Sequence, residues 1–513
     1  MGKSKTRLPI NIVANVVYIM LSIGMNFALV PYIVRKLGSE AYGFYSISND
    51  FTTYAGIITI ALNYMGCRFI AYSFHKSEMK EANKYFSSLF FGDVFLGIVL
   101  SIIALFIVGN IDKLLTMPTV LIDDIKYTFL FTFATFIFQV IMNAYTAGMY
   151  IKDRMDLYAI KNVVYVVLRA LIIVFLYSFF SPRIYYVSLA ALGGFFVSAI
   201  IDVVFTKKKV PEIKLSFRSY EKKYVGKLIS AGGWYSFVSM GTVLSKGVDL
   251  VIANQMVDTY SMGLLAISKT AISAFNQLKT AIINVFQPRM IYIYATETLD
   301  EFVKSVKEYM LLIGFILYVP LAGLTAFSRT FYCLWLSTYA SEQIDMINAL
   351  TLWGIFTCVF TVIVGCLPEL YAIINKLRIP TLVNFTQNII AFVLTLILLK
   401  ITGGNIYIIV SVSAIINMLY QFLFGIPYAA KLLNKQWWIF FPTAIKGLAA
   451  YGVLVVIFMV VDKLFVAKGW ISFGVTALLC GCLGYCISFI ILFNSAEKKK
   501  VFLIFRNNFR RKK

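Results

Sequence analysis

Three lysines interrupt two neighbouring apolar stretches that are each long enough to cross a bilayer: Lys246, Lys269 and Lys279. The one nearby acid is Asp249. A cation buried in the bilayer costs roughly 2.5 to 3.5 kcal/mol on insertion scales, so its presence needs a reason. A water-filled, positively charged cavity that receives an anionic substrate supplies that reason. The alternative for Lys246 is that it neutralises Asp249, three residues further along the same helix.

The four intramembrane cations are not equivalent as substrate ligands. Lys269 has no acid within helical reach, so it is the better ligand. Lys279 lies ten residues further on, about 80° away from the face of Lys269 on an ideal helix. Arg169 lies midway along another apolar stretch, too deep to reach the interface, where it either binds substrate or pairs with Asp93 or Asp202.

Polar side chains also form stripes, and the stripes indicate which helices line the cavity. One stripe recurs at steps of four, three, four and four, which places it on one face of a helix: Asn11, Asn15, Tyr18, Ser22 and Asn26. Three further stripes are Ser46, Asn49, Asp50 and Thr53; Ser239, Thr242, Lys246 and Asp249; and Lys269, Ser273, Asn276, Thr280, Asn284 and Gln287. We expect Asn15, Asn26 and Asn276 to bind the polar part of the substrate. The alternative is interhelical hydrogen bonding, worth only ~0.6 kcal/mol for an average pair.

Acids inside apolar stretches are candidates for coupling transport to an ion gradient. Four such acids are expected to carry a proton or a sodium ion: Asp50, Asp249, Asp93 and Glu369. Glu369 follows Pro368, so it is interpreted as a hinge or proton site, or otherwise as a residue at the cytoplasmic mouth. No nucleotide-binding motif of the GxxxxGK[ST] type is present, so the energy for transport has to come from outside the chain.

These residues belong to a polytopic membrane protein. Hydrophobic residues make up 60% of the 513 residues and charged residues only 14%. A helical span needs about 20 apolar residues. Fourteen spans are predicted: 10–34, 44–66, 87–109, 127–151, 157–180, 184–205, 228–256, 260–286, 309–327, 344–374, 379–399, 406–430, 438–461 and 470–493.

The positive charges set the orientation of these spans. With both termini in the cytoplasm, most of the 47 lysines and arginines fall in cytoplasmic segments, and only nine fall in outer loops. The formal net charge of +23 is scattered through short loops and the tail at 498–513, which favours contact with anionic lipid and excludes a nucleic-acid partner. Seven cysteines without a CxxC pair and a single histidine indicate neither a metal site nor a disulfide framework.

A faint internal repeat divides the chain. The segments VRKLGSEAYGFYSIS and ANQMVDTYSMGLLAIS place Gly43 and Gly263 at corresponding positions, 220 residues apart. Six crossings return the chain to its starting side, so the repeats must be parallel and enclose a central cleft. The predicted fold is all-α, with two six-helix lobes plus two C-terminal helices. Its predicted parts are a first lobe (1–206), a basic cytoplasmic linker (207–227), a second lobe (228–430), two additional helices (431–493) and a basic cytoplasmic tail (494–513).

The stretch PYIVRKLGSEAYGFYSISNDFTTYAGIITIALNYMGCRFIA resembles the amino-terminal signature of bacterial polysaccharide exporters. The matching residues are Pro31, Leu37, Gly38, Tyr42, Gly43 and Arg68. The stretch KGVDLVIANQMVDTYSMGLLAISK looks like the counterpart in the second half of that family, through Asp249 and Gly263. The motifs cover only these two helix pairs, whereas length and helix count agree over the whole chain.

The resemblance implies a flippase of the multidrug, oligosaccharidyl-lipid and polysaccharide exporter superfamily. Such a protein carries a polyprenyl-pyrophosphate-linked oligosaccharide across the bacterial cell (inner) membrane by alternating access, for capsule or O-antigen assembly. The implied partners are this lipid-linked substrate, membrane lipids, a polysaccharide polymerase and other assembly proteins, and the implied coupling ion is H⁺ or Na⁺ with no other cofactor.

Two other functions remain open. One is a cation-coupled multidrug exporter of the same superfamily, which should favour acids over lysines in its cleft. The other is a membrane glycosyltransferase or polysaccharide polymerase. An enzyme of this second kind needs a larger outer loop than 110–126, whose acids are Asp112, Asp123 and Asp124. We therefore expect a transporter and not an enzyme.

Overall fold

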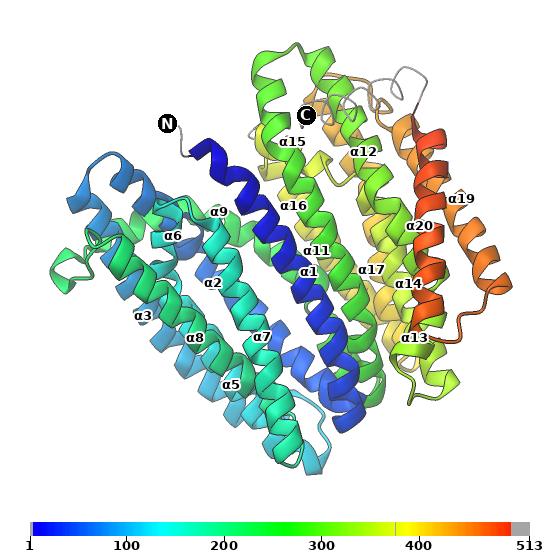
Figure 1. Cartoon of the computed structure of the whole chain (residues 1–513), viewed down its shortest axis with the longest axis horizontal. Helices are drawn as coiled ribbons and strands as arrows, with labels where there is room; N and C mark the ends of the chain where they lie inside the picture. The colour runs from blue at the N-terminus through cyan, green and yellow to red at the C-terminus, as the bar shows by residue number, and fades with distance from the viewer. Residues whose placement is uncertain (1–3, 375, 494–513) are drawn as a thin grey trace. The chain divides into compact units, whose positions relative to one another are not determined.

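The computed structural model describes residues 4–374 and 376–493, and every regular element in these ranges is helical (Figure 1). The elements up to the middle of the chain are α1 (Ser4–Leu37), α2 (Ser39–His75), α3 (Met79–Gly109), α4 (Ile111–Leu114), η1 (Thr119–Leu121), α5 (Ile122–Met142), η2 (Asn143–Thr146), α6 (Ala147–Ile151), α7 (Met155–Phe179), α8 (Tyr185–Lys209), η3 (Phe217–Ser219), α9 (Lys222–Lys246), α10 (Asp249–Met256) and α11 (Thr259–Thr296). The remaining elements are α12 (Leu299–Ala326), α13 (Ser328–Trp335), α14 (Ser341–Ile363), α15 (Leu367–Ile373), α16 (Arg378–Thr402), α17 (Ile406–Tyr420), the π-helical turn η4 (Gln421–Gly425), α18 (Ile426–Leu432), α19 (Phe441–Leu464) and α20 (Trp470–Leu492).

Each predicted span coincides with helix, although several spans are built from more than one element. The seventh is interrupted between α9 and α10, and the tenth between α14 and α15. Within the described residues, 11 helices are long and apolar enough to cross a membrane. The helices α2, α9 and α11, which carry three of the predicted polar stripes, are not among these 11. The all-α membrane fold is therefore confirmed, and the predicted count of fourteen is approximate.

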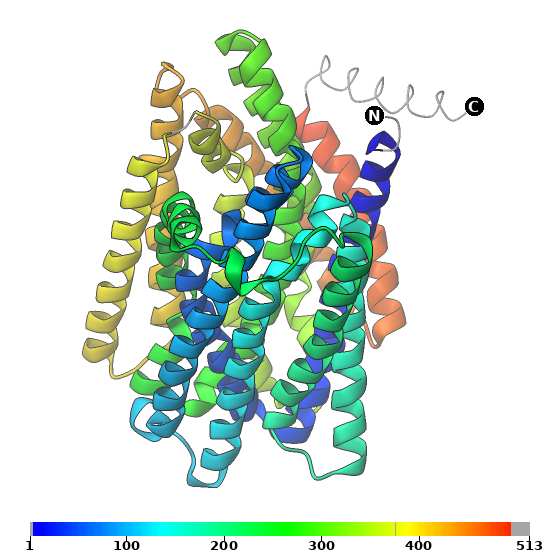
Figure 2. The ribbon, with the colours of Figure 1, turned by 90° about the vertical axis from the view of Figure 1, so that its left-hand side faces the viewer.

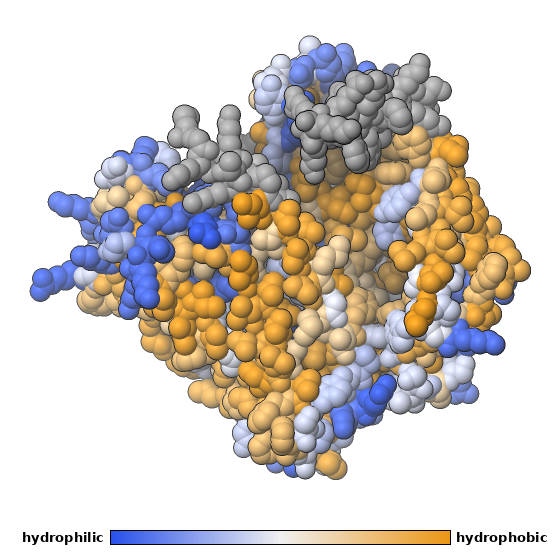
Figure 3. All heavy atoms as spheres, viewed as in Figure 1, coloured by the Kyte–Doolittle hydropathy of each residue, from blue (hydrophilic) through white to orange (hydrophobic). Residues whose placement is uncertain are grey.

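Large apolar side chains cover the flanks of the helices. Phe106 is 70% exposed, Leu478 72% and Ile471 85%. Surfaces of this kind are stable in lipid and not in water. Figure 3 shows the apolar flanks in orange, with a large group of hydrophilic residues around the loop between α8 and α9 and smaller hydrophilic patches along the lower edge of the view. This distribution is the one expected for helices that cross a bilayer.

The helices form two compact units. The first unit comprises Met1–Ile267 and Leu396–Ile406. Within it, α2 packs against α3, α5 and α9, while α8 packs against α5 and α7, and α1 lies along α7 (Figures 1 and 2). Buried residues of these helices form its core, among them Leu62, Ile70, Phe86, Leu89 and Leu228.

The second unit comprises Ser268–Thr395 and Tyr407–Lys513. Here α12 packs against α14, α19 and α20 (Figure 1). The ring of Tyr318 is fully buried at this junction, and its hydroxyl donates to the carbonyl of Val359 over 2.9 Å. Because a buried hydroxyl without a partner is unfavourable, this bond fixes the depth of α12 against α14.

The boundary between the units falls inside α11, after Ile267, and not at 207–227. The basic segment 207–227 belongs to the first unit, where it forms hydrogen bonds with α3. The Asn83 amide nitrogen donates to the carbonyl of Glu212 over 3.1 Å, and Asn83 Oδ1 accepts from the amide of Lys214 over 2.6 Å. The division into two six-helix lobes stays a prediction.

The two glycines identified from the internal repeat contact each other within the first unit. A methyl group on Gly43, in α2, would lie 3.1 Å from Cα of Gly263, in the second turn of α11. A methyl group on Gly263 would lie 2.4 Å from the carbonyl oxygen of Ser39. The two positions that the internal repeat pairs therefore lie in backbone contact, and the relation of two lobes by a pseudo-twofold axis stays a prediction.

Candidate functional site

An interruption between α9 and α10 brings together two of the predicted coupling acids. The helix stops at Gly247, whose carbonyl accepts a hydrogen bond from the hydroxyl of Tyr54 in α2. A side chain at residue 247 would lie 2.5 Å from the Tyr54 ring, so glycine is required for this approach. Asp50, one turn before Tyr54, and Asp249, the first residue of α10, both interact electrostatically with the Tyr54 hydroxyl.

Interruptions of this kind form ion sites in some membrane proteins. Discontinuous helices present carbonyl groups that regular helices keep occupied, and carboxylates beside them complete an oxygen-rich environment. The sequence placed Asp50 and Asp249 on the opening helix pairs of the two repeats, and the structure brings them to one tyrosine. Lys246 is the last residue of α9, and its side chain lies outside the described part of the structure. Its predicted role in binding substrate is therefore still a prediction.

Arg169 is a half-buried cation in the middle of α7. Its terminal nitrogen donates to the hydroxyl of Tyr45 over 2.7 Å, and Tyr42 and Tyr165 are its other electrostatic neighbours. The Nε atom has no hydrogen-bond partner, and no acid forms an ion pair with this guanidinium among the described residues. The positive charge is thus surrounded by neutral hydroxyl groups.

The alternative partners considered for Arg169 are bonded elsewhere. Asp202 accepts from the ammonium of Lys161 over 2.8 Å, and the two side chains are only 2% and 5% exposed. The pairing of Arg169 with Asp202 is therefore wrong. Lys161, near the start of the predicted span 157–180, forms this buried ion pair between α7 and α8. A buried ion pair of this kind adds little net stability, and it indicates that α7 and α8 pack in one specific arrangement.

Asp93 lies at the end of a partly buried chain of two amides. Asn143 Nδ2 donates to Asn63 Oδ1 over 2.6 Å, and Asn63 Nδ2 donates to Asp93 Oδ1 over 2.9 Å. Asp93 is fully buried, and its Oδ2 has no hydrogen-bond partner among the described residues. Its pairing with Arg169 is not found. The chain links α2, α3 and η2, and sequence periodicity did not reveal it because its members lie on three different helices.

In the second unit, α11 runs parallel to α14 and α15 with a constant offset of 82 residues. The five contacting pairs are Ile272 with Gly354, Asn276 with Cys358, Lys279 with Thr361, Ile283 with Gly365, and Gln287 with Glu369. The steps of four, three, four and four lie on one face of a helix. We call this row of pairs the α11 seam.

The seam gives three predicted site residues a partner inside the protein. The Lys279 ammonium donates to Thr361 Oγ1 over 2.9 Å, Gln287 donates to Glu369 over 2.7 Å, and the Asn276 amide oxygen lies 4.0 Å from the Cys358 thiol. These contacts favour interhelical bonding for Asn276, Lys279 and Glu369. Lys269, ten residues before Lys279, is half-buried and lies before the seam begins.

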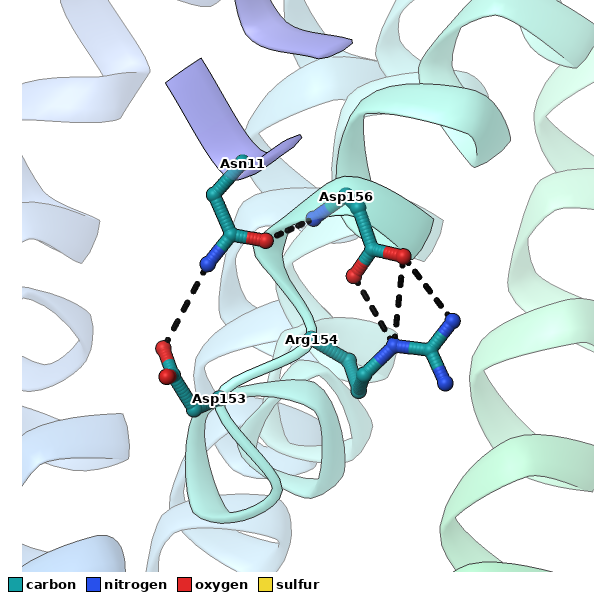
Figure 4. A network of polar contacts seen from close by, with 4 residues as sticks. All are labelled: Asn11, Asp153, Arg154 and Asp156. Atoms are coloured by element: carbon teal, nitrogen blue, oxygen red, sulfur yellow. Dashed lines mark hydrogen bonds and ion pairs between the residues drawn. The ribbon is translucent and has the colours of Figure 1, made fainter. Parts of the chain in front are cut away.

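The polar stripe of α1 begins with a structural residue. Asn11 is 9% exposed, accepts the backbone amide of Asp156 over 2.9 Å and donates to Asp153 over 3.4 Å (Figure 4). It therefore occupies the place of an N-cap for α7 from a neighbouring helix, because Arg154 at the cap position makes no such bond. Further along α1, Asn15 is exposed and Asn26 half-buried, and their predicted contact with substrate stays a prediction.

The turn held by Asn11 also carries a bidentate ion pair. Arg154 donates from Nε and from a terminal nitrogen to the carboxylate of Asp156, over 2.9 and 2.8 Å (Figure 4). This hydrogen bonding raises the pKa of Arg154. Arg154 lies outside the spans and is charged at any physiological pH, so the ion pair stabilises the turn before α7 at every such pH.

A family profile and a curated relative match this chain. The profile described as polysaccharide biosynthesis protein matches residues 10–294. The chain is 24% identical over 505 residues to an uncharacterised membrane protein, EpsK, of Bacillus subtilis (strain 168), with 98% of each chain covered.

Solved structures share the fold. The lipid II flippase MurJ in an inward closed conformation aligns with a TM-score of 0.69 and 14% identity, over 93% of this chain and 97% of that one. An inward-facing multidrug resistance transporter of the MATE family, in the MOP superfamily, aligns with a TM-score of 0.60 and 14% identity, over 86% and 94%. At these identities the likeness shows the fold alone.

Proposed function

The chain belongs to the polysaccharide biosynthesis protein family, and from that premise we propose that it is a flippase for a polyprenyl-pyrophosphate-linked oligosaccharide. It moves the repeat unit from the cytoplasmic to the outer leaflet of the bacterial cell membrane by alternating access, for surface polysaccharide assembly. Its termini lie in the cytoplasm, and a polysaccharide polymerase consumes its product. The pyrophosphate and the glycan enter the polar interior while the prenyl chain stays in lipid.

The observation that carries this proposal is the environment of Arg169. A guanidinium at mid-depth in a membrane helix, surrounded by tyrosines and not ion-paired with any acid in the described ranges, keeps its full attraction for an anion. Guanidinium also matches phosphate geometry through paired N–H donors, and Nε of Arg169 is buried without a hydrogen-bond partner among the described residues. The tyrosine hydroxyls and rings around it suit the sugars that follow the pyrophosphate.

The test measures flipping directly. Vesicles are reconstituted with the purified protein and a fluorescent polyprenyl-pyrophosphate glycan, and a membrane-impermeant quencher reports the fraction on the outer leaflet over time. Arg169→Gln should slow flipping at least tenfold, as expected when a desolvated charge partner is removed, and Arg169→Lys should retain part of the rate. Arg183→Gln is the matched control, because Arg183 is an exposed arginine paired with Asp124. Wild-type flipping by Arg169→Gln would remove the basis of the proposal.

The main alternative is an exporter of organic cations, since MATE transporters share the fold. An uncompensated arginine in the interior disfavours a cationic substrate by direct repulsion. The same vesicles distinguish the two functions: an exporter moves a fluorescent organic cation and leaves the lipid-linked glycan where it is. We propose a transporter and not an enzyme, and no growth of glycan chains from sugar donors is expected in these vesicles.

Energy coupling is the second part of the proposal. The acids at the α9–α10 interruption, Asp50 and Asp249, are proposed to bind the coupling ion, H⁺ or Na⁺, beside the Gly247 carbonyl. Asp93 is the next candidate because its buried Oδ2 has no hydrogen-bond partner among the described residues. Glu369, which accepts from Gln287, is a weaker one.

A further inference from the structure

A cavity of about 550 Å³ lies at the end of the twelfth predicted span, within the second unit. Side chains of η4, α18 and the turn before α19 form it, among them Leu423, Phe424, Tyr428, Lys431, Lys435 and Trp437. None of these residues belongs to the polar stripes or to the α11 seam. The cavity is therefore separate from the groups assigned to transport.

The apolar wall of this cavity is a ladder of aromatic rings. The rings of Phe424 and Tyr428 are stacked at 4.9 Å with planes 14° apart, and Tyr420 continues the stack against Phe424 at 5.6 Å. The π-helical turn η4 contains Phe424, and such a turn inserts one extra residue into a helix and shifts the following side chains. Trp437, 64% exposed, and Leu423, 75% exposed, complete an open hydrophobic surface.

The other wall is cationic. Lys431 is exposed, and no ion pair joins it to an acid among the described residues. Lys435 pairs with Asp300 of α12, which fixes the turn but leaves Asp300 itself 81% exposed and outside the lining. Asn434 takes a left-handed conformation, with φ 51°, and so reverses the chain after α18 and brings Trp437 back beside Lys431.

The aromatic wall and the cationic wall together match a ligand that carries both a negative charge and an apolar part. The span that ends in α18 is one of the long apolar helices, so the cavity opens at the level of the lipid headgroups. Lysine, tyrosine and tryptophan at that level contact phosphate groups and glycerol, and polybasic sites attract anionic lipid. A free phosphate would leave the aromatic ladder unused, and a neutral apolar ligand would leave Lys431 unused.

We propose that this cavity binds an anionic glycerophospholipid of the surrounding leaflet, with its phosphate at Lys431 and its acyl chain along Phe424 and Tyr428. By the predicted topology this is the cytoplasmic leaflet. The bound lipid fills the space between α18 and the turn before α19. It thereby stabilises the packing of α19 and α20 against the end of the twelfth span. This inference does not depend on which molecule the protein transports.

The experiment counts bound lipids on the full-length protein by native mass spectrometry in detergent. Phosphatidylglycerol and phosphatidylcholine with identical acyl chains are compared. The wild type should retain phosphatidylglycerol preferentially, and Lys431→Gln should lower that retention about fivefold, the effect of one lysine at a charged membrane surface. Trp437→Ala should lower retention of the same lipid.

Matched controls are available in the chain itself. Trp438 is the neighbouring residue, 49% exposed, and does not line the cavity, while Lys463 is an exposed lysine at the far end of α19. Trp438→Ala and Lys463→Gln should bind phosphatidylglycerol as the wild type does. Circular dichroism and gel filtration confirm that each variant is folded before it is compared.

Three results would overturn the proposal. The first is wild-type retention of phosphatidylglycerol by both Lys431→Gln and Trp437→Ala. The second is displacement of the lipid by inorganic phosphate alone, which would make the cavity a simple anion site. The third is displacement by an equimolar polyprenyl pyrophosphate, together with loss of flipping in Lys431→Gln, which would assign the cavity to the transported substrate.

Discussion

Gly43 of α2 and Gly263 of α11 lie in backbone contact, with Cα of Gly263 only 3.1 Å from where a methyl group on Gly43 would be. The two residues are separated by 220 positions and correspond to each other in the internal repeat. Their contact brings the N-terminal ends of α2 and α11 together where any larger side chain would separate them. The two glycines are not equally constrained, however.

Gly263→Ala should destabilise the protein more than Gly43→Ala. The new methyl group at residue 263 meets the backbone of Ser39 at 2.4 Å, whereas the nearest atom to one at residue 43 is the flexible end of Met262. Overpacking of this kind costs about 1–3 kcal/mol. Thermal unfolding in detergent measures the difference. Gly452→Ala is the control, since nothing lies within 4 Å of that position. A melting temperature of Gly43→Ala or Gly452→Ala as low as that of Gly263→Ala would contradict the prediction.

The buried ion pair of Lys161 and Asp202 should show strong coupling. Lys161→Met or Asp202→Asn alone leaves a charge buried without its partner, which costs about 3–5 kcal/mol, whereas removing both charges is far less harmful. We expect each single variant to unfold at a lower temperature and the double variant Lys161→Met/Asp202→Asn to recover part of the loss. Additive losses in this double-mutant cycle would mean that the two side chains act independently.

Lys269 and Lys279 should separate into a transport residue and a structural residue. Lys269→Glu is expected to abolish glycan flipping with the protein still inserted and folded, and Lys269→Arg to retain part of it, because the positive charge attracts pyrophosphate where screening is weak. Lys279→Gln should keep most of the flipping rate, since its ammonium is bonded to Thr361. Initial rates in reconstituted vesicles, beside melting temperatures, distinguish the two outcomes. Normal flipping by Lys269→Glu would contradict the prediction that the positive charge of Lys269 attracts the pyrophosphate.

Asp50→Asn should slow flipping and weaken its dependence on the proton or sodium gradient. The acid lies with Asp249 around Tyr54, whose hydroxyl donates to the carbonyl of Gly247. Tyr54→Phe removes that donor and should slow flipping while leaving the response to the gradient in place. Vesicles with and without each gradient provide the measurement. Equal rates under all conditions, for wild type and Asp50→Asn alike, would leave these acids as structural groups.

The helices could be predicted from the sequence because each apolar stretch indicates a span regardless of its neighbours. The relations between helices could not, since they depend on packing depth. A lysine near the start of a predicted span usually extends to the headgroups, yet Lys161 is buried against Asp202. One signal was available: the two residues lie at nearly equal distances before and after the turn at 180–184, so in an antiparallel helix pair they reach the same depth.

The polar stripes were informative but did not distinguish cavity from contact. In α11, Asn276 and Gln287 lie on the stripe, and the structure shows them against α14 and α15. A stripe identifies the face of a helix that avoids lipid and says nothing of whether water, substrate or another helix lies opposite. Asn11 is a second example, because its side-chain oxygen accepts the backbone amide of Asp156 in the first turn of α7.

The α11 seam also constrains how the length of this chain can change. Five contacts share one offset of 82 residues, so an extra residue in the connecting segments between 297 and 340 leaves every pair intact. An extra residue inside α11 between Lys279 and Gln287 turns the later positions by about 100° and removes Gln287 from Glu369. Insertions and deletions among relatives of this protein are therefore expected in the turns around α12 and α13 and not along the seam.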